Sequence, residues 1–367
     1  MSRKIRTLFK NLRKEIVTDD LILKIVSDDY SIDLSTHKEW LTKSEIICSY
    51  ECSPHKIVSI VKYLDDFFIV IPEDKECAVF DCADVSGNYL QTDLLFKEID
   101  ALKIFIWSQV PNYKNPHIDE SDLLYNVFLQ PEKNKFDISD LERFFLVFDI
   151  WKLDEACIDV SKLGANEYSK LLCFKLYSIY LLSNKELLSL NLSHNGLDEI
   201  IKSTLVLHGD LISMPFFRGL TSTNWEHLFL EFYRCIERLY GFPVVNSIIS
   251  LISSTGDITC DFDLVIKDNE RKYNLRPNEE SALTSLLELS NCNPFVDSFA
   301  IKYDIQSEGK KVEKVASRIY KRRNSIAHWR KALEEDSLSV DAEFMSIITE
   351  IISQLYGVYG GFLRMVS

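Results

Sequence analysis

The sequence predicts an α+β protein, in which an N-terminal domain of mixed α/β character precedes an all-α helical bundle. Short β-branched and aromatic runs broken by proline and glycine fill residues 45–110, whereas apolar residues recur at helical spacing beyond residue 222. The chain has 367 residues, enough for two domains of ordinary size. We expect these domains at residues 1–210 and 220–367, divided near the helix breakers Gly209, Pro215 and Gly219.

The N-terminal domain combines both kinds of element. Residues 1–17 have the pattern of an amphipathic basic helix, which we expect to dock on its own domain; binding to a membrane surface or to RNA is the alternative. Strands are predicted within residues 65–73, 77–90 and 101–110, and helices within 137–153 and 166–182.

The C-terminal part is predicted to be an antiparallel helical bundle. Its first helix begins after Asn224, a residue type that caps helices, and ends near Gly241. Further helices are expected within residues 247–254, 278–290, 308–333 and 341–363, with one long irregular connection before Pro277.

The composition of the chain indicates its cellular compartment and the state of its cysteines. No run approaches the roughly 18 apolar residues that a membrane-spanning helix needs, and no signal peptide pattern is present, so we expect a cytoplasmic protein. The nine cysteines are scattered without a repeated spacing, which favours buried thiols over a disulfide framework. We expect neither a metal nor another cofactor.

The distribution of charge favours an anionic ligand in one segment. The whole chain carries a net charge of −14, which is unusual for a nucleic-acid-binding protein. Between Lys310 and Lys331, however, nine basic residues accompany a single acid, Glu313, so this segment carries +8 and the remainder −22. A localised basic helix attracts phosphate, although a merely solvated helix face is the alternative.

The same segment contains Arg323-Asn324-Ser325-Ile326-Ala327-His328, an arginine followed by a polar residue and, five positions on, a histidine. This motif, in the penultimate helix of a bundle that opens with an aromatic-rich helix, resembles the signature of the HEPN superfamily. The resemblance covers residues 222–362 and is greatest to the Apea-like branch found in abortive-infection and antiphage proteins. It implies a metal-independent endoribonuclease that acts as a homodimer with a composite site.

The residue types suit that chemistry. Cleavage by the ribose 2′-hydroxyl needs a base, an acid and a cation that holds the phosphate. The histidine, His328, is the residue type best suited to act as base or acid, and Arg323 can grip two phosphate oxygens. Asn324 lies one helical turn before His328, where its amide can orient the imidazole or bind the phosphate.

Other side chains are expected to assist. We expect phosphate contacts from further basic residues of the segment, namely Arg318, Lys321, Arg322 and Arg330. Glu237, in the first bundle helix, is a candidate supporting residue, and Trp329 is a candidate for stacking on a base. RNA is the expected substrate, and the N-terminal domain is expected to sense an unidentified trigger, such as a phage component or antitoxin, or to restrain the nuclease.

Three alternatives stay open. A HEPN domain without catalysis would be an adaptor that binds nucleic acid or a protein partner. Residues 187–197 match one leucine-rich repeat, but a scaffold of this kind needs several repeats and we find no second copy. A zinc site would have to use side chains whose spacing misses the usual knuckle, namely Cys48, Cys52, His55, Cys77 and Cys82.

Overall fold

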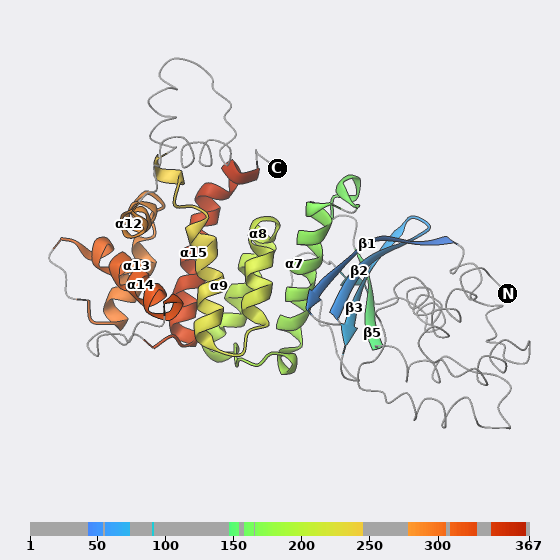
Figure 1. Ribbon diagram of the computed structural model, residues 1–367, viewed down its shortest axis with the longest axis horizontal. Coiled ribbons are helices and arrows are strands. Elements are labelled where there is room, and N and C mark those ends of the chain that lie inside the picture. Colours follow the sequence, from blue (N-terminus) through green and yellow to red (C-terminus); the bar gives the residue numbers. More distant parts are fainter. Residues whose placement is uncertain are drawn as a thin grey trace, which may run out of the picture. The chain divides into compact units, whose positions relative to one another are not determined.

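A computed structural model describes residues 43–53, 56–73, 90–91, 147–153, 158–164, 166–244, 278–305, 309–328 and 339–364 (Figure 1). The chain forms two compact units, Met1–Cys173 and Phe174–Ser367. The first holds an antiparallel sheet and the second is helical, so the predicted mixed α+β class with a helical C-terminal part is confirmed. Helix α7, Glu167–Ser183, runs across the division between them.

The first unit contains a five-stranded sheet in the order β1-β2-β3-β5-β4, with every pair antiparallel. Successive residues of its central strands are almost fully buried, which explains their continuous apolar sequence. The strands are β1 (Ser44–Ser53), β2 (Lys56–Tyr63), β3 (Asp66–Glu73), β4 (Leu90–Gln91) and β5 (Val147–Leu153).

The strand β5 corrects one prediction. Residues 137–153 were expected to be helical, but Val147–Leu153 pairs with β3 and β4 as a strand. A short run of aromatic and β-branched residues fits either periodicity, and here the pairing with β3 decides. Of the other predictions, residues 65–73 are confirmed as a strand and 166–182 as a helix, whereas residues 1–17 and 101–110 lie outside the described residues.

The second unit is built around two long helices, α8 (Leu197–Leu220) and α15 (Ala342–Arg364), which pack against each other. Helix α9, Trp225–Glu237, packs on both and is capped by Asn224, whose side chain accepts from the backbone N–H of His227 at 2.8 Å, as predicted. Three further helices complete the bundle: α12 (Glu279–Leu289), α13 (Asn293–Lys302) and α14 (Lys311–Ala327).

The expected division between residues 210 and 220 falls within α8, because the helix continues through Gly209 and Pro215. A proline removes the bond from its own nitrogen to the carbonyl four residues earlier, here that of Leu211. The guanidinium of Arg238, directly after α9, donates to this Leu211 carbonyl at 3.0 Å. A side chain from the neighbouring helix therefore replaces the lost donor.

Among the described residues, one helix, His194–Leu220, is long and apolar enough to cross a membrane by length and composition alone. Of its most apolar stretch, 56% is buried inside the protein, as in the core helix of a soluble protein. The single leucine-rich repeat match, residues 187–197, begins at one short 3-10 turn, Lys185–Leu187, and contains a second, His194–Gly196. It ends at Leu197, where α8 begins.

We expect Arg238→Ala to lower the free energy of unfolding by about 1–2 kcal/mol, because it leaves the Leu211 carbonyl without its side-chain donor. Pro215→Ala supplies an N–H at the position where the helix lacks one, so the same arginine substitution should have a smaller effect in that background. Chemical denaturation of the four proteins measures this coupling. Equal losses in both backgrounds would show that the arginine does not replace the missing donor.

Candidate functional site

Helix α14 carries the predicted site residues at its C-terminal end. Its apolar stripe of Val315, Ala316 and Ile319 is buried, and the helix packs against α9, α12 and α13. The helix ends at Ala327, and His328 caps it with its backbone N–H bonded to the Asn324 carbonyl at 3.1 Å. Burial of the stripe therefore fixes which way the last turn of the helix faces.

Arg323 lies half-buried at the centre of a cluster of polar side chains. Its Nη2 is 2.5 Å from Oε1 of Glu237 on α9, and its Nη1 is 3.8 Å from Oε2 of Glu279 on α12. The Nη1 also donates to the Oδ1 of Asn324 at 2.8 Å, and the guanidinium carbon is 5.9 Å from the centre of the Tyr233 ring. We call Arg323, Asn324, Glu237, Glu279 and Tyr233 the arginine cluster.

The two carboxylates control the electrostatics of Arg323. Burial alone would lower the pKa of the guanidinium, but Glu237 and Glu279 outweigh it and raise the pKa above its ordinary value. The arginine is thus permanently charged, and it faces two carboxylates. A phosphate that binds here has to compete with Glu279, the more distant and more exposed of the two, at 44% side-chain exposure.

The Tyr233 ring lies under the guanidinium of Arg323, and a second tyrosine is hydrogen-bonded to it. The hydroxyls of Tyr233 and Tyr240 form a hydrogen bond in the interior. Burial raises the pKa of Tyr233, and burial together with the neighbouring Tyr233 raises that of Tyr240. Both hydroxyls therefore stay protonated near neutral pH, and they shape the cluster without serving as proton acceptors.

His328 stands apart from the arginine cluster. Its side chain is exposed and makes no hydrogen bond or ion pair with any described residue. The Asn324 amide oxygen, which we expected to orient the imidazole or bind phosphate, accepts from Arg323 instead. One chain therefore brings Arg323 and Asn324 together and leaves His328 available to a partner or a substrate.

Several described basic residues of the segment have partners within the protein. Arg322 pairs with Glu226 at 2.7 Å, and its buried Nε has no hydrogen-bond partner among the described residues. Arg318 donates to the Tyr303 carbonyl at the end of α13 at 2.8 Å. Two lysines at the start of the helix also form ion pairs, Lys310 with Glu313 at 3.3 Å and Lys311 with Asp297 at 2.7 Å.

Lys321 differs from these residues, since it is exposed and no described residue pairs with it. It is therefore the predicted phosphate contact with an available charge. The other predicted contact, Arg330, and the candidate stacking residue Trp329 lie outside the described residues.

The sequence left part of the cluster unnamed. Glu237 was singled out as a supporting residue, and the structure places it on Arg323. Glu279 and Tyr233 were missed, because their partner lies more than 40 residues away in the chain and only the packing of α9, α12 and α14 brings them together. The acidic first turn of α12 was the available signal.

No group of three histidine, cysteine or acidic side chains among the described residues is arranged to hold a metal ion. Cys48 of the alternative zinc set is buried in β1, and the side chains of Cys52, His55, Cys77 and Cys82 lie outside the described part of the chain. Within the described ranges Cys48, Cys173, Cys235 and Cys292 are free thiols.

Comparison of the chain with protein-family models, curated proteins and solved structures found no match.

We expect a larger coupling free energy between Arg323 and Glu237 than between Arg322 and Glu226. The side chains of Arg323 and Glu237 are both less than one third exposed, whereas Glu226 is 51% exposed. In double-mutant cycles with alanine we expect a coupling of about 1–2 kcal/mol for Arg323 with Glu237, and below about 1 kcal/mol for Arg322 with Glu226. Urea denaturation of each set measures both values, and the reverse order would contradict the cluster as described.

Proposed function

We propose that the helical unit is a HEPN-type domain and that the protein is a metal-independent endoribonuclease. The observation that carries the proposal is the arrangement around the motif: Arg323 is fixed by Glu237 and Asn324, and the exposed His328 follows at the end of the same helix. The arginine supplies a permanent positive charge in a defined position. The histidine supplies a group that can take or give a proton near neutral pH.

The proposed reaction assigns a role to each group. A base removes the proton of the ribose 2′-hydroxyl, the 2′-oxygen bonds to phosphorus, and the bond from phosphorus to the 5′-oxygen breaks. The departing 5′-oxygen takes a proton from an acid, so the products are a 2′,3′-cyclic phosphate and a 5′-hydroxyl. Arg323 and Asn324 hold the phosphate as its negative charge increases.

A base and an acid are both needed, while each chain offers one motif histidine. We therefore propose that two copies of the chain form a composite site in a homodimer, with one His328 from each copy. Glu279 would yield its place beside Arg323 to the phosphate, since it is the weaker of the two carboxylate contacts. Glu237 would stay in contact and keep the guanidinium oriented.

The wider role that fits this activity is an antiphage, abortive-infection or toxin-type effector acting in the cytoplasm. The α+β part would sense the trigger or restrain the nuclease until the trigger arrives. A second candidate function is a non-catalytic adaptor that binds nucleic acid or protein. It is favoured by the internal pairing of the basic helix, since residues such as Arg322 and Lys311 already have carboxylate partners.

Purified protein incubated with total cellular RNA in EDTA should produce fragments that end in cyclic phosphate. We expect Arg323→Ala and His328→Ala each to lower the cleavage rate by about 100-fold or more, because one removes the phosphate contact and the other the proton transfer. Lys310→Ala, directly before the same helix and paired with Glu313, is the matched control and should cleave like the unmodified protein.

The result separates the two functions. Activity that disappears with EDTA would contradict a metal-independent nuclease. Absence of cleavage by every protein, combined with RNA binding that both substitutions leave unchanged, would favour the adaptor.

Lys321→Ala should weaken RNA binding by about threefold for all sequences alike, because an exposed lysine that contacts phosphate attracts without reading bases. The cleavage rate at saturating RNA should stay unchanged, since this side chain lies outside the arginine cluster. Filter binding with two unrelated RNA sequences measures the effect, and Lys310→Ala is again the control. An affinity equal to that of the control would remove Lys321 from the RNA-binding surface.

A further inference from the structure

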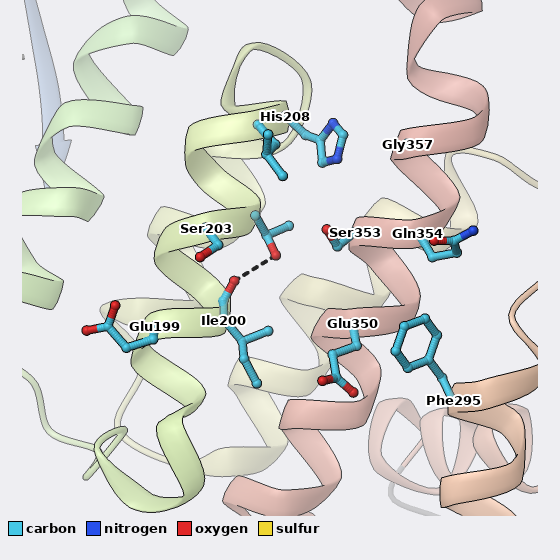
Figure 2. Close-up of a pocket in the computed structure, with 11 residues that line it drawn as sticks. Glu199, Ile200, Ser203, His208, Phe295, Glu350, Ser353, Gln354 and Gly357 are labelled. Atoms are coloured by element: carbon cyan, nitrogen blue, oxygen red, sulfur yellow. Dashed lines mark hydrogen bonds between the residues drawn. The ribbon is translucent and has the colours of Figure 1, made fainter. Parts of the chain in front are cut away.

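A second concave site lies in the helical unit, away from the arginine cluster. Helices α8, α13 and α15 border a pocket of about 540 Å³, to which none of the motif residues contributes. Figure 2 shows Glu350 and Ser353 on α15 across from the side chains of α8, with Phe295 of α13 beside them. A volume of this size accommodates a small organic molecule.

Some polar groups of the pocket already have partners. The Thr204 hydroxyl donates to the Ile200 carbonyl at 2.7 Å, drawn as a dashed line in Figure 2. The Gln354 amide donates to the Ser290 carbonyl at 3.0 Å. These contacts fix part of the walls. The other polar side chains of the lining are those of Glu199, Ser203, His208, Glu350 and Ser353.

The charge of the lining is acidic. Glu199 and Glu350 both contribute to the pocket, and the described lining residues include no lysine or arginine; the remaining titratable side chain is that of His208. Glu350 is half-buried and forms no ion pair with the described residues. Burial raises the pKa of its carboxyl group, so the ionised form is held at a free-energy cost that a nearby positive charge would offset.

The remaining walls are apolar. Ile200 and Leu207 of α8 and Phe295 of α13 contribute hydrocarbon surface, and Leu207 is 60% exposed at the rim. An aromatic ring close to a carboxylate suits a ligand that has both a charged and an apolar end. Gly357 of α15 leaves the rim open, because a Cβ atom placed there would meet nothing within 4 Å.

We propose that this pocket binds a small organic cation, with its ammonium group on Glu350 and its apolar body against Phe295, Ile200 and Leu207. The site is separate from the proposed cleavage site, and ligand binding at it does not depend on that function.

Three probes of one skeleton test the proposal: 4-phenylbutylamine, the neutral 4-phenylbutanol and the anionic 4-phenylbutyrate. Ligand-observed NMR titration against the full-length protein measures their dissociation constants. We expect the amine to bind at least about tenfold more tightly than the alcohol, and the carboxylate to bind more weakly than both. Equal affinities for the amine and the alcohol, or no binding of the amine, would overturn the proposal.

Two matched pairs of variants locate the binding. Glu350→Gln should lower the affinity for the amine about tenfold, whereas Glu288→Gln removes an exposed carboxylate of α12 outside the pocket and should leave it unchanged. Gly357→Leu should block all three probes by filling the rim. Gly361→Leu places the same side chain where space is also open but outside the lining, and should bind normally.

Circular dichroism and thermal unfolding of each variant confirm that the fold is kept. If both Glu350→Gln and Gly357→Leu bind the amine as tightly as the unmodified protein does, the binding site lies elsewhere and the proposal is wrong.

Discussion

The helical unit depends on the burial of α15. Nearly every apolar side chain of this helix is removed from water, and it packs on α8, α9 and α13. Two side-chain bonds set its position along the axis: the Tyr356 hydroxyl donates to the Cys235 carbonyl at 3.0 Å, and Gln354 donates to the carbonyl of Ser290. Because α9 and α12 are held to this central helix, the carboxylates they carry are held too.

The position of the motif follows from this packing. Helix α14 has a narrow apolar stripe, so only one rotation of the helix buries it, and this rotation turns Arg323 toward Glu237 and Glu279. Three of its basic residues, Lys311, Arg322 and Arg323, thereby form individual ion pairs with acids from neighbouring helices. What distinguishes the site is the defined position of one guanidinium, more than the total charge of the segment.

The sequence was sufficient for helices with a clear cap and a regular apolar period, such as α9 after Asn224 and α12 after Asn278. It was insufficient where two periodicities compete, as in β5, and where a breaker is compensated from outside the helix, as at Pro215 in α8. Helix α13 was missed because ten residues that begin with Asn293-Pro294 give little periodic signal. Local sequence patterns predict helix caps and apolar helix faces, but they do not predict contacts between residues that are distant in the chain.

For the site, the sequence identified the residues of the motif and one supporting acid. It could not show that the Asn324 amide faces Arg323 in preference to His328, because both lie within one helical turn and only the neighbouring helices decide between them. Glu279 required knowledge of how α12 crosses α14.

The contact between Arg238 and the Leu211 carbonyl has a consequence for the recognition of distant relatives. A proline inside a buried helix is tolerable here because Arg238, at the end of α9, supplies the missing donor to a carbonyl 27 residues away. Pro215 and Arg238 therefore depend on each other although they lie in different parts of the chain. Substitutions at these positions should therefore be correlated: a chain that loses the proline no longer needs the arginine. Paired variation of this kind can identify a shared helical unit even after its overall sequence similarity has faded.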